Sequence, residues 1–101
     1  MPAKIAIPLD QIAEFCKKYH VRKMSLFGSV IRDDFRPESD VDVLVEFLPD
    51  SKTTLLTLAG MEIELSEMLG GRKVDVNTPD MLSKYLRDEV LSEAETLYVA
   101  A

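Results

Sequence analysis

Between residues 40 and 47 the chain reads Asp-Val-Asp-Val-Leu-Val-Glu-Phe, so every second position is a valine or a phenylalanine. Side chains along a β-strand alternate between the two faces of a sheet. Residues 41 to 47 are therefore predicted to form a strand with one apolar face. Asp40 and Asp42 share the opposite face, about 7 Å apart. Two carboxylates on one strand face are a poor way to build a core.

Helices and further strands are predicted on both sides of this strand. Apolar residues recur at helical spacing over residues 8–19 and, after a cap at Thr53 or Thr54, over residues 55–68. Thr78-Pro79 is expected to begin a third helix that runs to about Ala94, and a break near Ser83 would divide it. Short strands are expected at 24–27, 73–77 and 95–99, with a helical turn from Val30 and a polar loop over 33–39. This order predicts an α/β (α+β) fold in which helices pack on a small mixed sheet.

The length and composition suit one small domain. The chain has 101 residues, of which 47% are hydrophobic, so residues 1–101 are expected to form a single domain with a modest core. No second domain is expected to bind a substrate. A partner subunit, in a homo- or hetero-oligomer, would add stability.

Charge and cysteine content exclude several classes of function. The 18 acidic and 12 basic residues give a net charge of −6, which argues against stable binding to nucleic acid. Cys16 is the only cysteine, and its place on an apolar helical stripe indicates a buried structural thiol. No apolar run approaches the ~20 residues that span a bilayer. We expect a cytoplasmic protein.

Three features of the sequence point to chemistry when they are taken together. Gly28-Ser29 stands at a strand-to-helix turn, Asp40 and Asp42 lie on the next strand, and Asp75 lies on a third. Carboxylates suit Mg²⁺, which binds one or two of them and completes its shell with water and phosphate. Glycine permits close approach of the backbone, and a serine hydroxyl with free N–H groups can hold phosphate oxygens.

Each of these features also has an ordinary explanation. Gly-Ser is a common turn, and Asp-x-Asp and Asp75 could be solvated charges. Asp75 could serve as a third metal ligand or as a base toward an attacking hydroxyl. The joint occurrence of the Gly-Ser turn, the Asp-x-Asp pair and Asp75 favours a site for metal and phosphate.

Several other residues that could carry chemistry are better explained by structural roles. His20 reads as a residue at the end of the first helix. Tyr85 and Tyr98 could contact a partner, but packing is the expected role of both. Glu62, Glu64 and Glu67 are expected to lie on the solvated side of the second long helix rather than to form a metal cluster.

The spacing of the main features resembles that of a known superfamily. Gly28-Ser29, ten intervening residues and Asp40-Val41-Asp42 match the mark of the nucleotidyltransferases that include DNA polymerase beta. The stretch LFGSVIRDDFRPESDVDVLVEF, followed by GRKVDVNTP and EAETLY, is similar to the minimal nucleotidyltransferases (MNT) over nearly the whole chain.

This resemblance implies a function and a set of site residues. Asp40, Asp42 and Asp75 would be catalytic and would bind two Mg²⁺ ions, while Gly28, Ser29 and Arg32 would hold the nucleotide. In that group the small enzyme is commonly an antitoxin that transfers AMP from ATP to a tyrosine of a HEPN-domain toxin. Ile31 and Asp33 depart from the family's usual alanine and glycine beside the arginine.

Two alternatives use the same residues differently. The chain could be a non-catalytic antitoxin, an interaction module that neutralises its partner by binding, or a nucleotide sensor without turnover. A broken site would favour the first of these, and the aspartates here are intact.

Overall fold

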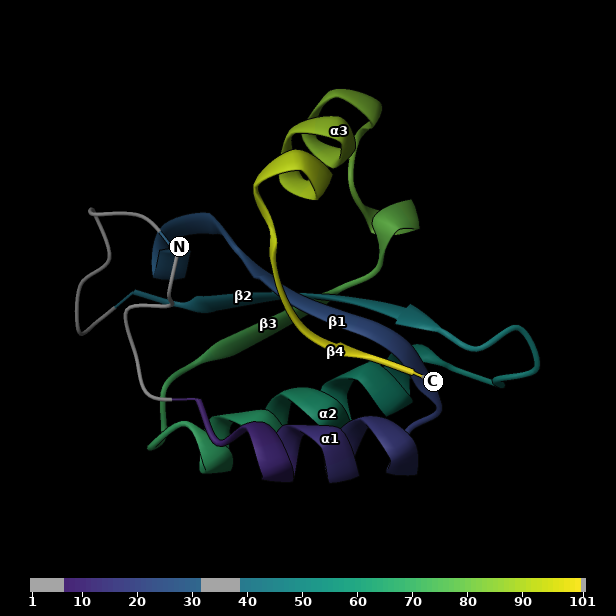
Figure 1. The fold of residues 1–101 in the computed structure, drawn as a ribbon, viewed down its shortest axis with the longest axis vertical. Coiled ribbons are helices and arrows are strands. Elements are labelled where there is room, and N and C mark those ends of the chain that lie inside the picture. Colours follow the sequence, from purple (N-terminus) through teal and green to yellow (C-terminus); the bar gives the residue numbers. More distant parts are fainter. Residues whose placement is uncertain (1–6, 32–38, 101) are drawn as a thin grey trace.

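The computed structural model describes residues 7–31 and 39–100 and confirms the predicted fold class (Figure 1). Three α-helices and two short 3₁₀ segments accompany a four-stranded mixed sheet. In chain order the elements are α1 (Leu9–Lys18), β1 (Val21–Phe27), η1 (Gly28–Ile31), β2 (Val41–Phe47), α2 (Leu55–Met68), β3 (Val74–Asn77), η2 (Pro79–Met81), α3 (Lys84–Glu93) and β4 (Glu95–Val99).

The strands lie in the order β3-β2-β1-β4. β1 pairs antiparallel with β2 and β4, whereas β2 and β3 are parallel and are joined through α2. This arrangement makes β3 and β4 the edge strands. β1 begins at Val21, three residues before the predicted start at Met24, because its pairing with β2 extends to Phe47.

One face of the sheet carries the main core. α1 and α2 lie side by side beneath this face in Figure 1. They cover the alternate valines of β2 and β3, and the core residues include Val41, Val43, Val45, Val74 and Val76. The alternation read from residues 41–47 therefore assigned the apolar face correctly.

The other face is covered in part by α3, which lies above the sheet in Figure 1. Leu82 and Val90 pack there on Phe27 and Leu44 in a second apolar cluster. Leu44 shares its strand face with Asp42, yet it is almost fully buried, whereas Asp42 is partly exposed. On this strand face, Leu44 is thus covered by α3, and the partly exposed Asp42 lies beside it.

Local capping explains where the later helices begin. Ser83 accepts a hydrogen bond from the backbone N–H of Leu86 at 3.3 Å and starts α3. Leu82 before it has extended backbone, so the predicted break near Ser83 is confirmed. Arg87 then joins the two segments, because its Nε donates to the carbonyl of Pro79 at 2.8 Å and its Nη2 to that of Leu82 at 3.2 Å.

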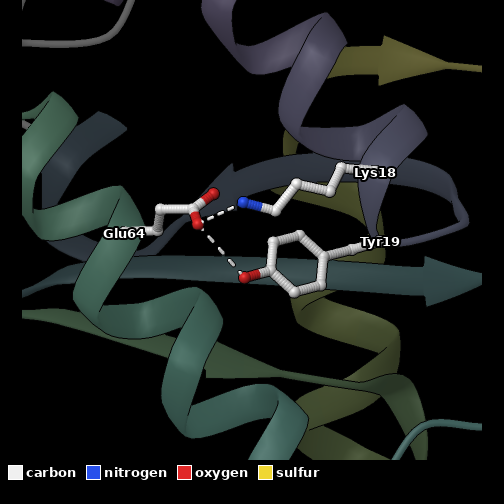
Figure 2. Close-up of polar contacts among 3 residues, drawn as sticks. All are labelled: Lys18, Tyr19 and Glu64. Carbon is white, nitrogen blue, oxygen red and sulfur yellow. Dashed lines mark hydrogen bonds and ion pairs between the residues drawn. The ribbon is translucent and has the colours of Figure 1, made fainter.

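Polar contacts join α1 to α2 (Figure 2). The carboxylate of Glu64 accepts hydrogen bonds from Lys18 Nζ and, at 3.2 Å, from Tyr19 Oη. Tyr19 also packs on Phe15, with ring centroids 4.8 Å apart. Glu64 therefore ties two helices together from the partly exposed side of α2, a role that the predicted solvated position did not reveal.

Of the remaining structural expectations, some are confirmed and one is wrong. Cys16 is fully buried and Tyr98 packs against the main core, as predicted. Tyr85 is 90% exposed, so its expected packing role was wrong. His20 lies just past the end of α1, with a φ of 59°. No helix within residues 7–31 and 39–100 is both long and apolar enough to cross a membrane.

Candidate active site

The parallel pairing of β2 and β3 brings two of the predicted aspartates together. Asp42 and Asp75 are direct partners in the strand register. Each is flanked by valines that are buried against α1 and α2, so both carboxylates project from the opposite face of the sheet. Residues 33 apart in the sequence thus meet at the edge of the sheet.

Gly28 lies against Asp42 on the other side. Phe27, the last residue of β1, pairs with Asp42, and Gly28 follows with a φ of +75°. A Cβ built on Gly28 would lie 3.3 Å from Asp42 Cγ and closer still to Oδ2. Both the backbone conformation and the missing side chain are therefore needed for the Asp42 carboxylate to lie where it does.

Asp40 joins the site from the residue before β2. Its Oδ2 lies 3.7 Å from Lys73 Nζ, and the next residue, Val41, donates its N–H to the carbonyl of Lys73 at 2.8 Å. The charge of Asp40 also acts on Asp75, raising the pKa of its carboxyl group. The start of β2 and the start of β3 are therefore held together beside the aspartates.

The crowded carboxylates affect one another's protonation. Burial raises the pKa of Asp75, and the negative charge of Asp40 raises it further. Glu62 acts in the same direction, while Lys73 opposes the rise in the pKa of Asp75. Negative charge accumulates here beyond what one lysine compensates, which is the electrostatic setting in which a cation binds favourably.

The donor atoms fit Mg²⁺, although the predicted three-carboxylate site is not formed in this structure. Within the described residues, no three His, Cys, Asp or Glu side chains are gathered closely enough to hold a metal between them. Mg²⁺ commonly takes only one or two protein carboxylates, with water and phosphate completing its shell. The roles of Asp40, Asp42 and Asp75 as ligands thus stay a prediction.

Glu62 is a site residue that the sequence did not reveal. Its Oε2 accepts a hydrogen bond of 2.8 Å from the backbone N–H of Val76 on the outer edge of β3. An edge strand leaves such N–H groups without a neighbouring strand, and Glu62 reaches across from α2 to satisfy one of them. The predicted place of Glu62 on the solvated side of its helix did not reveal this hydrogen bond, because helical spacing says nothing about the strand edge beside it.

A cleft of about 400 Å³ extends from the aspartates toward α3. Its acidic end is formed by side chains of β2, β3 and α2, and its apolar wall by η2 and α3. The described residues that line it are Phe27, Asp42, Glu62, Asp75, Val76, Asn77, Met81, Leu82 and Leu86. Asp42 and Asp75 therefore line a cleft that is large enough for part of a substrate.

Two residues expected to hold the nucleotide are only partly within view. The backbone of Ser29 lies in η1, directly after Gly28, and its side chain is outside the described residues. Arg32 and its neighbour Asp33 also lie outside them. Their contacts with a nucleotide stay predictions.

Comparison with known proteins assigns the family. A model of the nucleotidyltransferase domain matches residues 9–97. A Methanocaldococcus jannaschii protein named as a candidate protein adenylyltransferase is 40% identical over 77 residues, which is 76% of this chain and 80% of that protein.

Solved structures agree with this assignment. A structure described as a candidate minimal nucleotidyltransferase superposes with a TM-score of 0.70 at 34% identity, over 85% of each chain. The same fold occurs, at 19% identity and a TM-score of 0.64, in a complex of a tri-AMPylated Shewanella oneidensis HEPN toxin with an MNT antitoxin, where the match covers 91% of this chain and 70% of the other. This chain therefore belongs to the nucleotidyltransferase family of enzymes, among the minimal members of that family.

Proposed function

We propose that this chain is a protein adenylyltransferase that moves AMP from ATP onto a hydroxyl group of a partner protein. The observation that carries the proposal is the pairing of Asp42 with Asp75 on adjacent parallel strands, with Gly28 against Asp42. Protein adenylylation is supported by the name of the Methanocaldococcus relative.

Each residue of the candidate site has a role in the proposed transfer. The backbone at Gly28 and Ser29 lies against the triphosphate, which glycine permits by leaving room beside Asp42. Asp40 and Asp42 would hold Mg²⁺, which would compensate the charge of the phosphate oxygens and orient them for in-line attack. Two such ions are expected.

Asp75 is proposed to take the proton from the attacking hydroxyl. The hydroxyl oxygen forms a bond to the α-phosphorus, the bond to the bridging oxygen breaks, and pyrophosphate leaves. A carboxylate is a better proton acceptor when its pKa is raised, and burial together with Asp40 raises that of Asp75. Asp75 as a third metal ligand is the competing role.

The partner is proposed to be a HEPN-domain toxin, with a tyrosine as the acceptor and this chain as its antitoxin. The support is the AMPylated HEPN toxin bound to an MNT antitoxin of the same fold. The second candidate function is neutralisation of the same partner by binding alone. Tight docking would then suffice, and the aspartates would be dispensable.

One experiment separates the two functions. A HEPN-domain protein of the same genome is co-expressed with this chain, and the purified complex receives ATP labelled at the α-phosphate together with Mg²⁺. Label should appear on the partner with the wild-type chain, and it should be absent with Asp42→Asn and after addition of EDTA. A complex that forms without any label, and whose Asp42→Asn variant still silences the toxin in cells, would support binding alone.

A further inference from the structure

We propose that the apolar wall of the cleft, formed by Met81, Leu82 and Leu86, docks the acceptor segment of the partner protein, a segment with an apolar side chain and flanking basic residues. This inference rests on the proposed function and adds to it the surface that selects the acceptor. The wall would hold the segment so that its hydroxyl reaches Asp75.

The order of the strands separates a donor side from an acceptor side. Asp42 on β2 lies between Gly28, which follows β1, and Asp75 on the edge strand β3. Phosphates held at Gly28 therefore approach Asp42 from one side. In-line displacement requires the attacking oxygen to come from the opposite side of the α-phosphorus, which is the side of Asp75. The cleft opens on this side, and Gly28 is not among its lining residues.

The wall exposes apolar side chains beside the site. Met81 is 52% exposed and Leu86 is 45% exposed, and both line the cleft that contains Asp42 and Asp75. A single exposed leucine is ordinary on a protein surface. Convergence of two such side chains on one functional cleft is the pattern of a recognition surface.

The wall is held in place before any partner arrives. Leu82 is buried with Phe27 in the second apolar cluster, and Arg87 binds the carbonyls of Pro79 and Leu82. These contacts fix η2 and the start of α3 relative to the sheet. A rigid wall loses little conformational entropy on binding, so the contact of an apolar side chain contributes more of its energy to affinity.

Charge indicates what kind of segment fits. The charged residues that line the cleft are Asp42, Glu62 and Asp75, and of the described lining residues none is basic. Asp42 would bind Mg²⁺ and Asp75 would take the proton of the acceptor hydroxyl, whereas Glu62 stands where α2 meets the edge of β3. A basic residue next to the acceptor would pair with it, which favours a basic acceptor segment.

The test compares polar substitutions on the wall with polar substitutions of two more exposed leucines elsewhere. The wall variant is Met81→Gln with Leu86→Gln, and its matched control is Leu55→Gln with Leu56→Gln on α2, where both leucines are at least 78% exposed. For the wild-type chain and both variants, transfer of labelled AMP is measured at increasing concentrations of the HEPN-domain protein. Affinity for AMP-PNP with Mg²⁺ is measured by calorimetry.

The wall variant should raise the KM for the partner about tenfold or more, with kcat at saturating partner and AMP-PNP affinity unchanged. The control should match the wild type. Glu62→Gln, which keeps an acceptor for the Val76 N–H, should raise the KM for the partner and weaken its dependence on salt.

Three outcomes would overturn the inference. A loss of AMP-PNP affinity with an unchanged KM for the partner would assign the wall to the nucleobase. An unchanged KM in the wall variant, or an equal loss in the control, would remove the wall from partner recognition. If the wild-type chain binds the HEPN-domain protein but transfers nothing, the proposed function fails, and the dissociation constants of the same variants still test the docking.

Discussion

The carboxylate of Asp42 occupies the space that a side chain on Gly28 would need. A Cβ on Gly28 would approach Asp42 Cγ to 3.3 Å, and the φ of +75° already disfavours any other residue at this position. The end of β1 and the start of β2 are thus matched to each other at the candidate site. This relationship leads to the first prediction.

Gly28→Ala should lower transfer about a hundredfold or more, because the added methyl group displaces the Asp42 carboxylate from its position. Alanine in the left-handed region should also cost about 1–2 kcal/mol of stability. Transfer to the partner and urea unfolding measure the two effects.

Gly70→Ala is the matched control for that variant. Gly70 has a similar φ of +76°, but a Cβ there meets nothing within 4 Å. The control should lose comparable stability and keep its activity. Equal losses of activity in the two variants would mean that backbone strain, and not the contact with Asp42, accounts for the effect.

The double variant Asp40→Asn with Asp42→Asn should abolish transfer without unfolding the protein. Ligand carboxylates on one strand face repel each other when no cation is bound, so their removal should leave stability unchanged or raise it. The exposed pair between Asp40 and Lys73 contributes little. Thermal unfolding in EDTA checks the prediction, and a clearly lowered melting temperature would instead assign the aspartates a structural role.

Asp75→Asn should stabilise the metal-free protein at pH 7. Burial and the charge of Asp40 raise the pKa of Asp75 in the folded state above its ordinary value of 3.8. The folded state then holds this proton more tightly than the unfolded state, so ionisation of Asp75 destabilises the fold as pH rises above 3.8.

The gain from Asp75→Asn should therefore shrink as the pH falls toward and below 3.8. Urea unfolding midpoints in EDTA at pH 7 and near pH 3.5 measure it, with Asp50→Asn in an exposed loop as the comparison. A gain that is the same at both pH values would contradict the assignment.

Cys16 should be inert toward thiol reagents in the folded protein. Its side chain is fully buried, and burial raises the pKa of the thiol to about 12. Dithionitrobenzoate at pH 8 should react only after urea unfolds the chain. Fast reaction of the native protein would show that the contact between α1 and the sheet opens readily.

The same shift in Cys16 gives a dependence of stability on pH. The thiol of the unfolded chain ionises near pH 9.0 while that of the folded chain stays protonated, so this group lowers stability as pH rises from 9.0 toward about 12. The free energy of unfolding of Cys16→Ala, measured with urea, should therefore fall less steeply between pH 9 and pH 10.5 than that of the wild type.

Patterns along the chain predicted most elements because each reflects the environment of a single strand or helix. Alternation assigned β2 and its apolar face, and three-and-four spacing assigned α2. The spacing of Gly28, Asp40 and Asp42 was enough to indicate the family. The local pattern wrongly predicted that Tyr85 packs. Its helix has neighbours on only part of its surface, and Tyr85 is exposed.

The sequence by itself determined which residues are the candidates for the chemistry, because Asp40, Asp42 and Asp75 are polar residues set at fixed offsets within apolar strands. Only the tertiary structure decided what surrounds them. Strand order is a long-range property, and it placed Asp75 on the edge strand, where Glu62 of α2 reaches the N–H of Val76. The packing of Leu82 and Val90 on Leu44 likewise placed η2 and α3 beside the aspartates, where they form the apolar wall of a cleft. Such contacts join residues far apart in the chain, and no period along one element encodes them.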